Sequence, residues 1–242
     1  MLNIVKAEIL KSKRTMGRKL IFIFPMITFI MAFLLTGGLQ NAFAECVWNW
    51  WYIMILPMMV AILCYLTSAK EKKCRFFHMT TLETDRKKLM MGKVLYLGLS
   101  ILVSNIVIFV GAAINGHIFS TNVPFLGGAA FVIILTLTQL WEIPLFLYLS
   151  MKFGMVVNLI VALVITLAGT LVAPTGKWLF VFSSIPMRLA IPMLHILPNG
   201  LKVAASYPLA NLSAIPVGTI EAIVVFAASA YLFLRWFEKR EA

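Results

Sequence analysis

Few side chains in this 242-residue sequence are of the types and spacings that perform catalysis or bind metals. No two histidines stand at the spacing of a metal site, which usually needs two ligands about one helical turn apart. The motifs H-E-x-x-H and G-x-S-x-G are also absent. The histidines are His78, His117 and His195. The sequence therefore predicts neither a metal site nor a catalytic centre, and we expect the chain not to be an enzyme.

One short stretch looks like the end of a phosphate-binding loop. Gly176 and Lys177 stand in the order found there, but Trp178 replaces the required Ser or Thr. The glycine that belongs five residues before Gly176 is missing, because Leu171 occupies that position. The chain cannot bind ATP by this route, so any energy from ATP must come from a partner protein.

Polar groups inside apolar runs are the remaining candidates for a functional role. Glu142 is the one carboxylate well inside such a run, and an intramembrane carboxylate usually faces a cavity or a polar partner. A protonated carboxyl, or one bonded to carbonyls freed near Pro144, is an equally open interpretation. Glu221 lies near the end of a run, where exposure at the interface is expected. Asn105 and Asn115 are expected to hydrogen-bond to neighbouring helices.

The amino-acid composition indicates whether this chain folds in water or in a lipid bilayer. Hydrophobic residues make up 62% of the sequence, charged residues 12%, and the mean hydropathy is +0.96. Soluble domains are near half apolar and about a quarter charged, so the sequence predicts an all-α integral membrane protein formed by a single membrane domain, 1–242. The cysteines show no disulfide framework or metal cluster: Cys46, Cys64 and Cys74.

Six apolar runs are long enough to cross a bilayer, which takes about 20 residues. They are preceded by 1–19, whose pattern of Leu2, Val5, Ile9 and Met16 predicts an amphipathic helix in the headgroup plane. Trp48, Trp50 and Trp51 are expected to anchor the second span at the interface. The predicted spans are 20–39, 50–69, 94–116, 125–149, 155–173 and 216–237.

The basic residues fix the orientation of these spans. The stretches before the first span, between spans two and three, between four and five, and from the last turn of the sixth onward contain 18 of the 21 Lys and Arg residues. The other side has only three: Lys177, Arg188 and Lys202. By the positive-inside rule both termini are cytoplasmic. Because the net charge of +12 is explained by topology, no nucleic-acid partner is expected.

Two alternatives bear on this topology. The N-terminus could be a cleaved signal peptide, since Ala42-Phe43-Ala44 has the form of a cleavage site, but 20–39 is long enough to span and 1–19 has its own period. The apolar stretch 178–197 could be a seventh span. Pro186 and Pro192 interrupt it, and a seventh span would place the basic C-terminus outside. Short re-entrant helices within 174–215 fit better.

The segment 70–93 is longer and more charged than a simple connection needs. A short helix there would carry Phe76, Met79 and Leu82 along one side, directly after the charged stretch 70–75. Such an apolar ridge is typical of a protein-docking element. From the residues alone, a linker that snorkels on the lipid surface is the open alternative.

The arrangement resembles that of type-2 ABC export permeases. In that family a Glu follows the second span, and an Arg stands seven residues before the Lys of a Gly-Lys at the start of the third; Glu71, Arg86 and Gly92-Lys93 match these positions. The sequence departs from the pattern because no Gly-Thr follows Glu71, and Thr84-Asp85 replaces a proline-containing turn. Within the family the chain is most similar to the permeases of lantibiotic-protection transporters. That likeness rests on Lys152-Phe153-Gly154, on 185–189 and on 196–200.

The resemblance implies a specific transport role. The chain would pair with a second permease, identical or homologous, in a bacterial cytoplasmic membrane, above cytosolic ATPase subunits that bind ATP and Mg²⁺. It would hold no cofactor itself and would expel a cationic antimicrobial peptide. The implied coupling residues are Glu71, Arg75, Phe76, Phe77, Met79, Leu82 and Arg86. Candidate peptide contacts are Trp178, Arg188, Pro198, Asn199 and Gly200.

Two other functions stay open at this point. A proton-driven secondary transporter would use Glu142, although no inverted repeat is evident. A non-transporting immunity protein would protect the cell by sequestering the peptide.

Overall fold

The structure is a computed structural model, and it describes residues 1–40, 42–73, 86–119 and 123–240. In these ranges the chain is helical, with a single isolated β-bridge between Ile196 and Lys202. The elements in chain order are α1 (Leu2–Ser12), α2 (Met16–Thr36), α3 (Phe43–Trp50), the π-helical segment η1 (Trp51–Ile55), α4 (Leu56–Lys73), α6 (Arg86–Phe119), α7 (Phe125–Gln139), α8 (Glu142–Lys152), α9 (Met155–Val172), the 3-10 segment η2 (Trp178–Phe180), α10 (Ser184–Leu194) and α11 (Ala214–Arg240).

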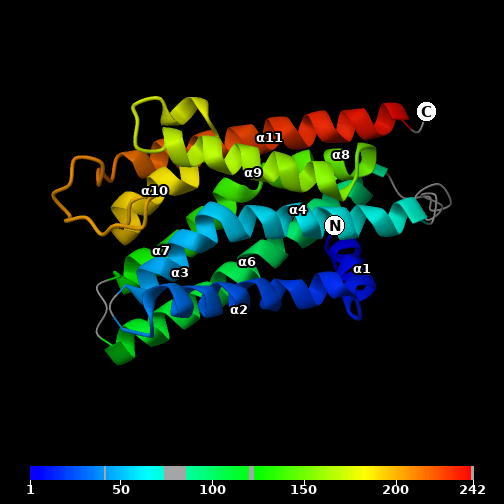
Figure 1. The fold of residues 1–242 in the computed structure, drawn as a ribbon. Coiled ribbons are helices and arrows are strands. Elements are labelled where there is room, and N and C mark those ends of the chain that lie inside the picture. Colours follow the sequence, from blue (N-terminus) through cyan, green and yellow to red (C-terminus); the bar gives the residue numbers. More distant parts are fainter. Residues whose placement is uncertain (41, 74–85, 120–122, 241–242) are drawn as a thin grey trace.

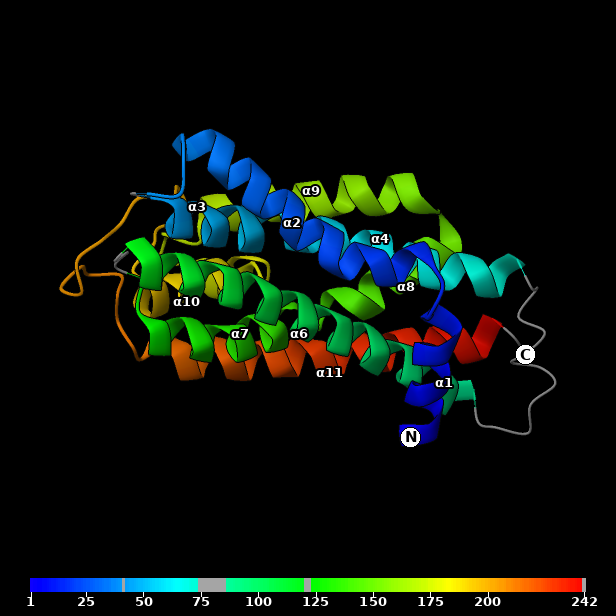
Figure 2. The same ribbon diagram turned by 90° about the horizontal axis from the view of Figure 1, so that it is seen from below.

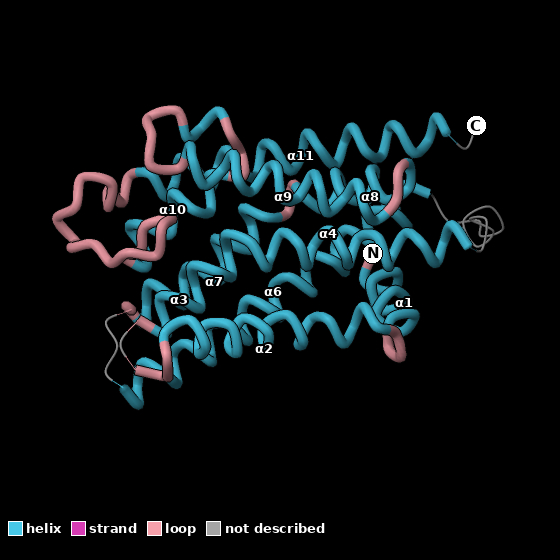
Figure 3. Tube along the Cα trace, viewed as in Figure 1, coloured by secondary structure: helices cyan, strands magenta, loops and turns pink. Residues whose placement is uncertain are grey.

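The long helices run side by side, and the two ends of the bundle differ (Figure 1). One end, here called the basic end, is formed by α1, the C-terminal ends of α4 and α11, and the start of α6. Helix α1 crosses this end at a steep angle to the others, as both views show (Figure 2). The opposite end carries α10 and the long loop 195–213, the largest loop in the described chain (Figure 3).

Five helices are long and apolar enough to cross a membrane. They are Met16–Thr36, Phe43–Lys72, Arg86–Phe119, Met155–Val172 and Ala214–Lys239, and the bent pair α7–α8 makes six if it counts as one span. Apolar side chains on α2, α9 and α11 are widely exposed, as expected for helices that face lipid. These features agree with the all-α, multi-pass membrane protein predicted from the sequence.

The second predicted span begins earlier than expected and runs as one helix over α3, η1 and α4. The prediction of an interfacial tryptophan anchor is wrong for Trp48 and Trp51, which are buried. The ring of Phe131 on α7 lies edge-on to Trp48 at 5.5 Å and to Tyr52 at 5.9 Å. These aromatic rings therefore belong to the core of the bundle, where such pairs stabilise beyond their buried area.

The fourth predicted span is broken. Helices α7 and α8 meet at an angle of 41°, with Leu140 and Trp141 between them. Pro144 stands in the first turn of α8 and has no N–H, so an uninterrupted helix would leave the carbonyl of Leu140 without its donor. Breaking the helix just before this turn avoids that cost and puts Glu142 at the start of α8.

The N-terminal region and the outer proline segment also differ from expectation. The predicted helix 1–19 is divided, because α1 ends at Ser12 and α2 begins at Met16. Leu2 and Ile9 of the expected apolar stripe are exposed, while Glu8 is buried. Pro186 and Pro192 do not interrupt α10: Pro186 stands in its first turn, where no N–H is needed, and the helix continues through Pro192.

Candidate functional site

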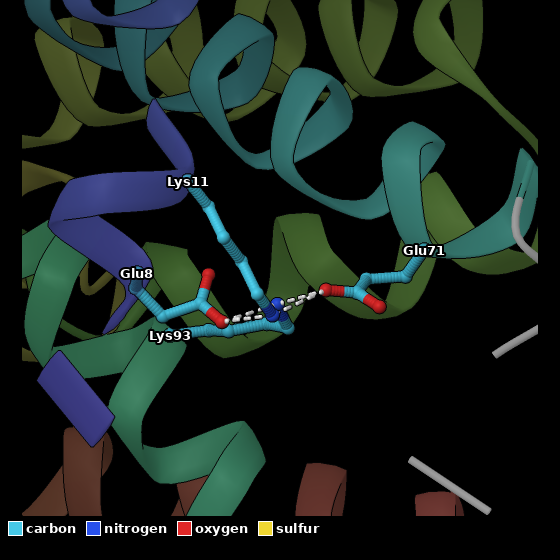
Figure 4. A network of polar contacts seen from close by, with 4 residues as sticks. All are labelled: Glu8, Lys11, Glu71 and Lys93. Carbon is cyan, nitrogen blue, oxygen red and sulfur yellow. Dashed lines mark hydrogen bonds and ion pairs between the residues drawn. The ribbon is translucent and has the colours of Figure 1, made fainter. Parts of the chain in front are cut away.

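Four charged side chains meet at the basic end of the bundle, and they come from three helices (Figure 4). The Lys93 ammonium of α6 donates to Glu71 Oε1 of α4 at 2.6 Å and to Glu8 Oε1 of α1 at 3.0 Å. Lys11 of α1 donates to the same two oxygens, at 3.0 Å to Glu8 and 3.4 Å to Glu71. Two carboxylates thus share two ammonium groups. We call these four residues the inner ion cluster.

The cluster is largely closed to solvent at its centre. The Lys93 side chain is only 1% exposed, and the two carboxylates that accept hydrogen bonds from its ammonium offset the cost of burying it. Burial alone would lower the pKa of Lys11, but the carboxylates of Glu8 and Glu71 outweigh it, and the pKa is raised. The ion pairs between these side chains fix α1 to α4 and α6.

The local sequence explains how α1 reaches this site. Val5, Glu8 and Ser12 recur at helical spacing and form the buried face of α1. Ile4 of α1 lies directly against Gly92, where a side chain would collide with it. Because Gly92 lets the two helices approach closely, the neighbouring Lys93 can reach across to α1.

The implied coupling residues fall in two groups. Arg75, Phe76, Phe77, Met79 and Leu82 lie outside the described residues. Glu71 is buried and forms an ion pair with Lys93 in the inner ion cluster. Arg86 begins α6, and the next residue, Lys87, forms an ion pair of 2.9 Å with Glu238 near the end of α11. The start of α6 is therefore tied to both α1 and α11.

Glu142 lies at the break between α7 and α8 and is buried. When the side-chain amide of Gln139 is oriented so that its nitrogen faces Glu142, this nitrogen donates to Glu142 Oε1 at 2.7 Å and to Glu142 Oε2 at 3.3 Å. Cys64 of α4 donates its thiol to the carbonyl of Ile143 at 3.7 Å. The carboxyl therefore has a polar partner on its own span, and the break has a contact from α4.

The amides of the candidate spans connect helices. Asn105 Oδ1 accepts from Trp51 Nε1 at 2.7 Å, and its Nδ2 donates to Thr136 Oγ1 at 2.9 Å, which joins η1, α6 and α7. Asn158 of α9 was not singled out from the sequence, yet it donates to the Ala61 carbonyl at 3.1 Å and to Ser150 Oγ at 2.6 Å. A lone amide in an apolar run was the signal that could have identified Asn158.

The candidate peptide contacts separate into two groups at the opposite end. The Arg188 guanidinium stacks over the Trp178 ring at 5.9 Å, next to the start of α10. Pro198, Asn199 and Gly200 form a turn in the loop that follows α10. No hydrogen bond, ion pair or ring contact among the described residues joins the two groups.

Two further carboxylates differ from expectation at this end. Glu45 of α3 was missed: it is buried and forms a 2.7 Å ion pair with Lys202, which fastens the loop 195–213 to α3. Glu221 of α11 was expected to be simply exposed, but its Oε2 is buried and has no hydrogen-bond partner among the described residues. An ion pair between residues far apart in the chain leaves no local pattern in the sequence, so the Glu45–Lys202 contact could not be predicted.

Within the described ranges, no group of three or more His, Cys, Asp or Glu residues is placed to hold a metal ion. Comparison with family models, with curated proteins and with solved structures gave no match to this chain. The chemistry open to this chain therefore follows from the geometry of its own residues. At the basic end it offers a rigid, charged junction of helices, and at the α7–α8 break a buried carboxyl.

Proposed function

We propose that this chain is the membrane-spanning permease subunit of a peptide exporter and that a separate ATPase drives it. The observation that carries the proposal is the inner ion cluster. It joins the helix before the segment 74–85 to the helix after it, and both to α1. A partner that moved this segment would move α1, α4 and α6 together rather than bend one of them.

The topology proposed with it has six spans, both termini in the cytoplasm and re-entrant outer helices. The excess of Lys and Arg near the basic end supports the orientation. α10 supports the re-entrant element, because it is a short apolar helix buried in the bundle. The likeness to lantibiotic-protection permeases supports a cationic peptide as the substrate and a second permease as the partner.

Co-purification tests the proposal. The tagged chain would be extracted gently from native membranes, and the proteins that accompany it identified by mass spectrometry. We expect a stoichiometric subunit with a phosphate-binding loop, lost when Phe76 and Phe77 are both changed to Ala. Phe180→Ala is the matched control, because this ring at the opposite end is 83% exposed. If the chain purifies without an ATPase and peptide resistance does not need ATP, the proposal is wrong.

A second candidate, a proton-driven transporter, is favoured by one observation. Glu142 is a buried carboxyl at the break of a candidate span, and broken helices are where secondary transporters place their coupling sites. In this case Glu142→Gln abolishes peptide export, and export collapses with the proton gradient but survives ATP depletion. Export that Glu142→Gln leaves unchanged would exclude this mechanism.

A further inference from the structure

A cavity of about 240 Å³ opens beside the inner ion cluster, between α1, α4, the start of α2 and α6. Its lining divides into two kinds of surface. The charged side is formed by the four residues of the cluster together with Lys70, and the apolar side includes Leu63 and Leu66 of α4. A cavity with one charged and one apolar wall fits an amphipathic ligand.

The charges of the lining do not balance. Three lysines, Lys11, Lys70 and Lys93, face only two carboxylates, Glu8 and Glu71. Both carboxylates are paired with Lys11 and Lys93, and Lys70 forms no ion pair with a described carboxylate. The cavity therefore has one uncompensated positive charge, which a single phosphodiester would neutralise.

Two residues that carry hydroxyl groups also line the cavity. Thr67 and Tyr96 line the same cavity, and no hydrogen bond joins their hydroxyls to another described residue. An ammonium and two hydroxyls are the donors that a phosphate group accepts from.

We propose that this cavity binds the headgroup of one anionic phospholipid, with the phosphate at Lys70 and an acyl chain along Leu63 and Leu66. The position favours a lipid over a free phosphate. Lys70 lies near the end of the candidate span Phe43–Lys72, where the headgroups of a bilayer are expected if this helix crosses it, and Leu66 is part of that span. Basic pockets between membrane helices are typical sites for such headgroups. The proposal does not depend on the transport function.

Native mass spectrometry of the full-length chain tests it. The chain in detergent micelles would be titrated with phosphatidylglycerol and, separately, with phosphatidylcholine. We expect one phosphatidylglycerol to bind before any phosphatidylcholine. Lys70→Gln should weaken this binding about fivefold, the effect of one lysine near an anionic headgroup. Lys72→Gln should leave it unchanged, since Lys72 is an exposed lysine on the same helix end and does not line the cavity.

A hydroxyl-deletion variant and inorganic phosphate separate specific lipid binding from its alternatives. Tyr96→Phe removes only a hydroxyl and should cause a smaller loss of lipid affinity than Lys70→Gln. Inorganic phosphate, tested alone for protection against thermal unfolding, should protect far less than the lipid does. If it protects equally well, the ligand is a soluble phosphate and the lipid assignment is wrong. Equal loss in Lys70→Gln and Lys72→Gln, or none in either, would mean that lipid binds only a diffuse basic surface.

Discussion

Lys93 of α6 and Glu71 of α4 are 22 positions apart, yet their charged atoms lie 2.6 Å from each other inside the bundle. The two residues stand on either side of the segment 74–85, and Glu8 of α1 accepts a second hydrogen bond from Lys93. Glu71, one of the coupling residues implied by the family resemblance, is thus also a structural anchor between helices.

The first prediction concerns the buried lysine of the inner ion cluster. Lys93→Met should destabilise the protein by about 3–5 kcal/mol, because Glu8 and Glu71 lose a partner in a buried site. Thermal unfolding in detergent micelles measures the loss. Lys88→Met, an exposed lysine on the same helix, should change stability by less than about 0.5 kcal/mol. Equal losses in the two variants would contradict a structural role for the cluster.

The second prediction concerns Asn105, which bridges three helical elements. Asn105→Leu removes two interhelical hydrogen bonds and should cost about 1–2 kcal/mol, while Thr136→Val removes only one of them and should cost about 0.6 kcal/mol. Unfolding in micelles would rank the two variants. The reverse order would mean that Thr136 matters through its packing or its own backbone bond.

The third prediction uses two glycines as a matched pair. A methyl group on Gly169 would lie 2.8 Å from the backbone carbonyl of Ser183, whereas one on Gly176 would meet nothing within 4 Å. Gly169→Ala should therefore destabilise the protein by about 1–3 kcal/mol through overpacking. Gly176→Ala should leave the melting temperature unchanged or slightly raised. If both variants melt like the unsubstituted protein, the close approach of α9 to Ser183 is wrong.

The fourth prediction is an asymmetry within one ion pair. Glu45 is 1% exposed and its partner Lys202 is 45% exposed. Lys202→Met leaves a buried carboxylate unpaired and should cost about 3 kcal/mol or more, and it should also speed proteolysis of the loop 195–213. Glu45→Met leaves a lysine that water can solvate, and should cost under about 1 kcal/mol. Limited proteolysis and thermal unfolding of the two variants test this order.

The fifth prediction follows from the raised pKa of Lys11. A lysine whose pKa is higher in the folded protein contributes its stability below its unfolded pKa and loses it as the pH rises through the folded value. The stability difference between the unsubstituted protein and Lys11→Gln should therefore stay constant from neutral pH to about 10.5 and shrink only above it. A difference that falls between pH 7 and 9 would contradict the pairing.

The sequence predicted most span positions well because the ends of those spans carry local signals. The fifth span was expected over 155–173 and is found as Met155–Val172, where Gly154, at φ 97°, starts the helix and Pro174 follows soon after its end. The break of the fourth span was missed, because a hydropathy average does not detect a two-residue interruption.

The site was less predictable, for a physical reason. Glu71 was identified by family resemblance, but its partners are on α1 and α6, and no local pattern indicates an ion pair between segments so far apart. Glu8 is the only acid in the first 44 residues, and this isolation among cations was a usable signal. The burial of Trp48 and Trp51 could not be predicted from the sequence, because tryptophan occurs both at membrane interfaces and in protein cores.

The π-helical segment Trp51–Ile55 sets the angular phase between the two halves of one long helix. Glu45 lies before it and pairs with Lys202, and Glu71 lies after it and pairs with Lys93. One residue turns an α-helix by about 100°, so a single-residue deletion inside 51–55 would barely alter the hydropathy but would rotate one carboxylate away from its lysine. The orientations of the two carboxylates are therefore linked through one continuous helix. We expect an insertion or deletion within 51–55 to be tolerated less well than a substitution.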